Sequence, residues 1–74
     1  MARLVRLDRT GHTTLAEWTS GDGAGHEAAV AAFRAELDRG MVASMTHPDG
    51  TAEVIRDLPA EAELVVLRRP IAGG

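Results

Sequence analysis

The segment "RRPIAGG" at residues 68–74 has the residue types and spacing that would present a carboxylate for chemistry. Pro70 has no backbone N–H and favours an extended conformation in the residue before it, so it should stop strand pairing. Gly73 and Gly74 have no Cβ, so the backbone that carries the terminal carboxylate can pass through a narrow channel in another protein. The pattern predicts that the terminal carboxylate is the reactive group of the protein, with Gly74 as the reacting residue.

Other residues that can do chemistry lack the spacing of a known kind of site. The segment "GDGAG" (residues 21–25) lacks the Lys-Ser/Thr of a phosphate-binding loop and the spacing of a dinucleotide fingerprint, so we expect a plain loop. The histidines lack metal-ligand spacing and the serines lack an activating base, so we predict neither a metal site nor a catalytic residue. We interpret the histidines and the paired glutamates near the end of the chain as solvated. The residues considered are His12, His26, His47, Ser20, Ser44, Glu61 and Glu63.

The size and composition of the chain argue against an enzyme that works alone. The chain has 74 residues, enough for one small domain that buries only about 60 % of the surface of its unfolded chain. It contains no cysteine, which excludes disulfides, thiolate metal sites and a cysteine nucleophile. A small partner of larger proteins is the better interpretation.

The charge pattern argues against nucleic-acid and membrane binding. The net charge is −3, with both signs mixed along the chain, and the only aromatic residues are Trp18 and Phe33. These features provide neither a basic stripe nor a base-stacking platform. No apolar run approaches the roughly 18–20 residues of a membrane span, so we predict a cytoplasmic protein. All eight basic residues are arginine, which is typical of a GC-rich bacterial genome and leaves no side-chain amine for acylation.

The first half of the sequence predicts a hairpin and a helix. Apolar and β-branched residues flank "DRTG" (residues 8–11), which predicts two strands within residues 3–18. In "HEAAVAAFRAELDRG" (residues 26–40), apolar residues recur at helical spacing, with Glu27 near the start and Arg39 followed by Gly40 at the end. We expect Trp18 at the core or its edge.

The second half predicts another hairpin and a central strand. Residues 41–46 and 51–55 flank the turn "HPDG", and residues 56–62 form a connection. The last strand, residues 63–68, contains "LVVL" and is therefore expected in the middle of a sheet. Met41 and Met45 are expected to pack, and Arg56 to be solvated. One helix on a four- or five-stranded sheet makes an α+β domain.

The outline and the tail together resemble the ubiquitin-like β-grasp proteins. The segment "RTGHTTLAEW" (residues 9–18) is similar to the first hairpin of ubiquitin in its Thr-Gly-x-Thr turn. The segment "LVVLRR" (residues 64–69) resembles the arginine-bearing last strand of ubiquitin. The ending "RPIAGG" (residues 69–74) is similar to the Pro-apolar-x-Gly-Gly end of the small sulfur carriers of molybdopterin and thiamine biosynthesis.

This resemblance implies a single β-grasp domain over residues 1–69, with one helix on a mixed sheet and the last strand parallel beside the first, and a flexible tail over residues 70–74. It implies that a separate activating enzyme uses ATP to adenylate the Gly74 carboxylate, which then becomes a thiocarboxylate. The chain would bind no cofactor and would be monomeric in the absence of its partners. It would pass its sulfur to a biosynthetic enzyme. The residues implied in partner contact and threading are Arg68, Arg69, Pro70, Ile71, Ala72 and Gly73.

Two alternatives remain open. The first is a ubiquitin-like modifier that is conjugated through Gly74 to an amine of a target protein. The absence of lysine, and of an apolar patch that can be matched to that of ubiquitin, favours the carrier over the modifier. The second is a β-grasp interaction module that binds a partner through its sheet or a strand edge, without chemistry at the tail.

Overall fold

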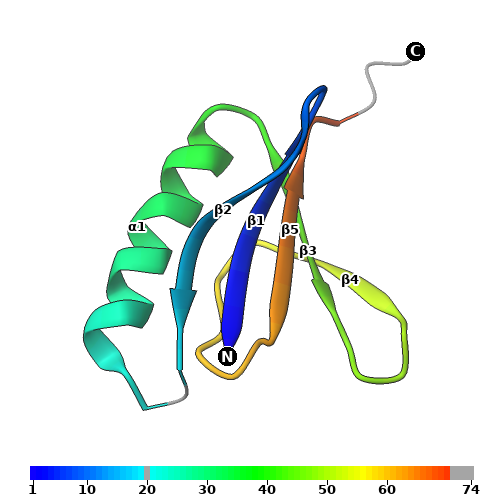
Figure 1. Cartoon of the computed structure of the whole chain (residues 1–74). Coiled ribbons are helices and arrows are strands. Elements are labelled where there is room, and N and C mark those ends of the chain that lie inside the picture. Colours follow the sequence, from blue (N-terminus) through cyan, green and yellow to red (C-terminus); the bar gives the residue numbers. More distant parts are fainter. Residues whose placement is uncertain (20, 71–74) are drawn as a thin grey trace.

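A computed structural model describes residues 1–19 and 21–70 of the chain. It contains one helix on one face of a five-stranded mixed sheet (Figure 1). The elements, in chain order, are β1 (Ala2–Asp8), β2 (Gly11–Trp18), α1 (Gly23–Asp38), β3 (Val42–Thr46), β4 (Ala52–Ile55) and β5 (Leu64–Arg68). The predicted α+β architecture is confirmed. Across the described ranges, no helix has both the length and the apolar character that a membrane crossing requires.

The last strand lies in the middle of the sheet, as predicted. The strand order is β2-β1-β5-β3-β4, with β5 parallel to β1 and antiparallel to β3. Val65 and Leu67 are buried in the core with Phe33, whereas Val66 faces the other way and is half-buried. The strand is therefore flanked on both edges and covered on one face, an arrangement that is compatible with a β-grasp fold.

Both predicted hairpins form. In the first, Asp8 pairs with Gly11, and in the second, Thr46 pairs with Ala52. The register of the first hairpin shifts between Leu4 and Val5. A bulge places one extra residue in one strand and so changes which side chains face the core. This shift accounts for the imperfect alternation of apolar and polar residues in the first hairpin.

The predicted start of the helix was wrong by three residues. The helix begins at Gly23, inside the segment predicted as a loop, because the Asp22 side chain caps it: Gly25 N donates to Asp22 Oδ1 at 3.0 Å. Glu27 therefore lies one turn inside the helix rather than at its positive end. The predicted ending is confirmed, since Arg39 is the C-cap and Gly40 adopts the positive φ of 90° that favours glycine.

The core lies between α1 and the sheet. Phe33, Leu4, Val65 and Leu67 are its largest fully buried side chains. Trp18 is also buried, as predicted, and its indole Nε1–H donates to the backbone oxygen of Ala60 at 3.0 Å, which ties β2 to the connection before β5. This packing holds β5 firmly against its neighbours and so sets the place where the chain leaves the sheet.

Candidate functional site

The described part of the predicted tail lies at the end of the central strand. Arg68 is the last residue of β5, and Arg69 and Pro70 follow it outside the strand. All three are exposed, and Arg68 still pairs with Val42 of β3. The other predicted site residues lie outside the described residues; they are Ile71, Ala72, Gly73 and Gly74.

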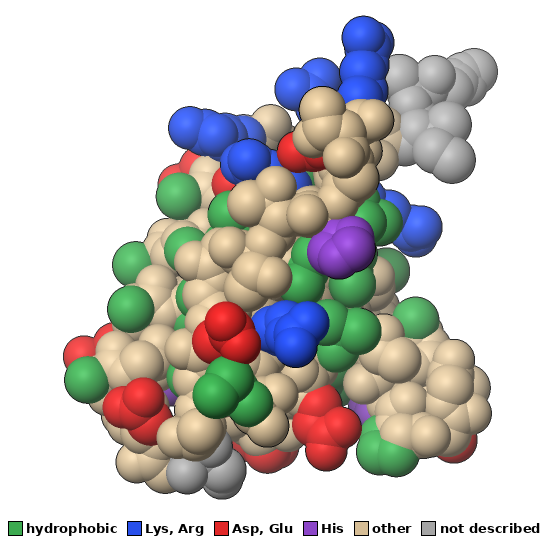
Figure 2. All heavy atoms as spheres, viewed as in Figure 1, with side chains coloured by type: hydrophobic (Ala, Val, Ile, Leu, Met, Phe, Trp, Pro, Cys, Tyr) green, Lys and Arg blue, Asp and Glu red, His purple; other side chains and the backbone are tan. Residues whose placement is uncertain are grey.

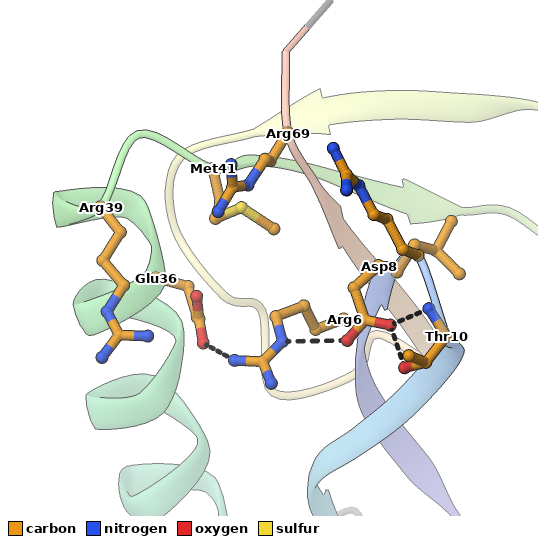
Figure 3. A pocket seen from close by; sticks show the side chains of 9 residues that line it. Arg6, Asp8, Thr10, Glu36, Arg39, Met41 and Arg69 are labelled. Carbon is orange, nitrogen blue, oxygen red and sulfur yellow. Dashed lines mark hydrogen bonds and ion pairs between the residues drawn. The ribbon is translucent and has the colours of Figure 1, made fainter.

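A hollow of about 720 Å³ lies next to this exit (Figure 3). It is lined by residues of β1 and its turn, the end of α1, the residue before β3 and the residue after β5. Its charged lining consists of Arg6, Asp8, Arg9, Glu36, Arg39 and Arg69. Leu7 and Met41 provide the apolar part. In Figure 2, most of the blue side chains, all of which are arginine in this chain, lie at this end of the molecule. Of the predicted site residues within the described ranges, Arg69 is the one that lines the hollow.

The floor of the hollow is an ion-pair network between the helix and β1. Arg6 Nη1 donates to Glu36 Oε1 at 3.0 Å, and Arg6 Nε lies 3.9 Å from Asp8 Oδ2 (Figure 3). The side chain of Glu36 is 9 % exposed and that of Arg6 is 30 % exposed. A nearly buried carboxylate requires a partner of opposite charge, so this pair joins α1 to the sheet beneath the hollow.

We expect the change Glu36→Ala to lower the free energy of unfolding by about 1–2 kcal/mol, because it leaves Arg6 without its inner partner. The loss should stay below the roughly 3–5 kcal/mol of a fully buried pair, since Arg6 is partly solvated and keeps Asp8. Urea unfolding measures the effect. The matched change Glu27→Ala, at an exposed position of the same helix, should alter stability by less than about 0.5 kcal/mol. Equal losses in the two variants would contradict a structural role for the pair.

A second carboxylate, that of Asp8, is held by the turn between β1 and β2. Asp8 Oδ1 accepts hydrogen bonds from Thr10 Oγ1 at 2.6 Å and from Thr10 N at 2.9 Å. These bonds, with Arg6 nearby, hold the pKa of Asp8 below its usual value. Asp49 and Thr51 repeat the arrangement in the second hairpin, and the pKa of Asp49 is lowered for the same reason.

These lowered pKa values predict a loss of stability in acid. Each carboxylate stabilises the fold while it is charged, and the contribution is lost as the pH falls below 3.8, the ordinary value, and through the lower folded pKa. The double variant Asp8→Asn, Asp49→Asn should therefore be less stable than the parent at neutral pH and should lose less stability on acidification. Urea midpoints at about pH 6 and about pH 2.5 measure both quantities. Parallel acid losses in parent and variant would contradict the assignment.

The histidines are less exposed than predicted. His12 is exposed on β2, but His26 and His47 are half-buried. His26 Nε2 lies 2.8 Å from the backbone oxygen of Leu58, and His47 Nε2 lies 3.0 Å from Glu53 Oε1. These contacts are structural. Within residues 1–19 and 21–70, no group of three or more potential ligands could hold a metal ion.

The remaining candidates behave as surface or packing groups. Glu61, Glu63 and Arg56 are exposed, as predicted, and Ser44 is half-buried on β3, whereas Ser20 lies outside the described residues. Met41 and Met45 are half-buried and pack against the core, as predicted. The helix start at "GDGAG" suits no phosphate, because the carboxylate of its own N-cap aspartate occupies the position beside the backbone N–H of Gly25.

Sequence reasoning missed the hollow. A signal was present in both elements. Ala2, Leu4 and Arg6 stand at every second position of β1 and therefore lie on one face of the strand. Glu36 follows Phe33 by three residues and therefore lies on the inner face of the helix. Opposite charges at inward positions of two elements indicate a pair between them. The positions of Arg39 and Arg69 around that pair depend on the tertiary fold, so no local pattern indicates them.

Comparisons with known protein families, with curated proteins and with solved structures found no match to this chain. The resemblance to sulfur carriers therefore stays a prediction.

Proposed function

We propose that this chain is a small β-grasp sulfur-carrier protein whose working group is the carboxylate of Gly74. The observation that supports this most is the position of Arg68, Arg69 and Pro70. They leave the sheet from a central strand that is paired on both edges, and they are exposed. A tail that begins at such a fixed point can be presented to the active site of another enzyme, and the sequence after Pro70 ends on two glycines.

The proposed chemistry takes place in a separate activating enzyme. The Gly74 carboxylate attacks the α-phosphorus of ATP, pyrophosphate leaves, and an acyl-adenylate forms. Hydrosulfide then attacks the acyl carbon, the C–O bond to AMP breaks, and a thiocarboxylate remains. The carrier supplies a positioned end, and the partner supplies the electrostatic stabilisation of the transition states. The exposed arginines at the base of the tail would contact that partner.

The test uses the untagged protein in a lysate of the native host, with ATP and sodium sulfide, followed by intact-mass measurement. Exchange of sulfur for oxygen adds about 16 Da, as does methionine oxidation, so the sample is also treated with a thiol-directed alkylating reagent. The chain has no cysteine, so an alkylated product indicates a thiocarboxylate. Heavier covalent species with other proteins would favour the modifier. A mass that stays unchanged with and without ATP would favour the interaction module.

A further inference from the structure

Positive charge is concentrated at one end of a protein whose net charge is −3. Four of its eight arginines line the hollow at the end of β1 and β5, against two carboxylates. Arg68, at the end of β5, adds a fifth arginine close to the same end. The lining therefore carries an excess of two positive charges, which attracts an acidic ligand although the whole molecule is acidic.

Both carboxylates of the hollow already have partners. Glu36 accepts from Arg6, and Asp8 accepts from Thr10 and faces Arg6. In contrast, no ion pair among the described residues involves Arg9, Arg39 or Arg69. The guanidinium groups of these three side chains are available to a ligand, and each can bind a carboxylate with two parallel hydrogen bonds.

The arrangement suits an extended ligand better than a small anion. The three arginines come from the turn after β1, the end of α1 and the residue after β5, so they reach the hollow from three separate segments. Met41 lines the hollow together with Arg39 and Arg69, and in the view of Figure 3 its side chain overlaps that of Arg69. Leu7 is 44 % exposed and provides a second apolar contact. The C-terminal end of the helix disfavours an acid, but the backbone oxygens of Glu36 and Leu37 there already accept hydrogen bonds from the N–H groups of residues 39–41. The arginines must therefore supply the attraction.

We propose that this hollow binds an acidic segment of a partner protein, in which acidic and apolar residues stand at every second position and so lie on one face of an extended chain. Arg9, Arg39 and Arg69 bind the carboxylates, while Leu7 and Met41 pack against an apolar side chain between them. The volume of about 720 Å³ lies within the roughly 300–1,000 Å³ of ligand sites and accommodates a few residues of an extended chain. The inference goes beyond the proposed function, since it requires no reaction at Gly74.

The test measures binding of a fluorescein-labelled decapeptide by anisotropy at low salt. Glutamate and leucine take turns at every second position of the peptide, with serine between them, so that both kinds of side chain face one side of the extended chain. The double variant Arg39→Glu, Arg69→Glu should bind at least about tenfold more weakly than the parent. The control is Arg3→Glu, Arg56→Glu, which changes the net charge equally at two exposed arginines outside the hollow. The affinity of the control variant for the peptide should fall by less than about twofold. Circular dichroism checks that both variants are folded.

Three results would overturn the proposal: no binding to the parent, equal weakening in both double variants, or unchanged binding when glutamine replaces every glutamate of the peptide. Displacement of the peptide by inorganic tripolyphosphate at matched charge would assign the hollow to phosphate ligands and would also overturn it. A parent that binds the peptide but is never modified at Gly74 would contradict the proposed function alone.

Discussion

Removing Gly74 should abolish activation of the protein and leave its fold intact. The shortened chain still ends in a glycine carboxylate, but that carboxylate lies about 3.5 Å short of its reacting position. A displacement of even about 1 Å can cost a hundredfold in rate, so we expect the ATP-dependent formation of the alkylatable product to fall at least about 100-fold. The measurement is the lysate assay with intact-mass detection, at equal protein concentration.

Two further variants keep the length of the tail and change only the size of one side chain. They test whether the end of the chain must be narrow enough to pass through a channel, or whether any tail of this length is sufficient. Gly73→Val keeps the length but adds a β-branched side chain where the proposed channel is narrow, so product formation should fall by a similar factor. Ala72→Gly keeps the length and removes only a methyl group, and it should remain active. Activity at the parent level in the chain that lacks Gly74 would exclude the carboxylate as the reacting group.

Truncating Phe33, the largest of the side chains that are less than 2 % exposed, should nearly unfold the protein. Phe33 is 1 % exposed and is the only phenylalanine of the chain. The change Phe33→Ala is expected to cost about 3–5 kcal/mol, from lost burial and the cavity left behind. A domain of this size has a total stability of only about 4–11 kcal/mol, so the loss removes a large part of it.

Thermal unfolding followed by circular dichroism measures this effect. For a domain of this size, each kcal/mol corresponds to about 4–8 °C, so the midpoint should fall by at least about 12 °C. Phe33→Leu keeps most of the apolar volume and should cost less than about 1.5 kcal/mol. A midpoint within a few degrees of the parent for Phe33→Ala would contradict the single core between α1 and the sheet.

The sequence predicted those elements of the fold that local chemistry specifies. The turn at "DRTG" lies between β1 and β2, Gly40 ends the helix with a positive φ, and the apolar run 64–67 lies in the central strand. The start of the helix was misplaced because Gly23 and Gly25 are poor helix formers, and the cap at Asp22 outweighs their propensity.

The site could be predicted only in part. The residues of the tail follow one another in the sequence, so the exposed exit at Arg68 and Arg69 could be predicted locally. The hollow beside it depends on Arg6 and Glu36, which lie 30 positions apart, and on which ends of α1, β1 and β5 come together. That juxtaposition depends on the parallel pairing of β1 with β5, a non-local contact. The resemblance to β-grasp proteins implied this pairing, but no local pattern of residues indicates it.

The most direct test of the central claim is the position of the alkyl group on the protein treated with ATP and sulfide. Trypsin should cut after Arg68 but not between Arg69 and Pro70, which releases residues 69–74 as one peptide. Fragmentation of that peptide should place sulfur and alkyl group on Gly74, and only when ATP was present. An alkyl group on any other residue, or an unmodified terminal peptide in every ATP-treated sample, would contradict a carrier that works through its C-terminal carboxylate.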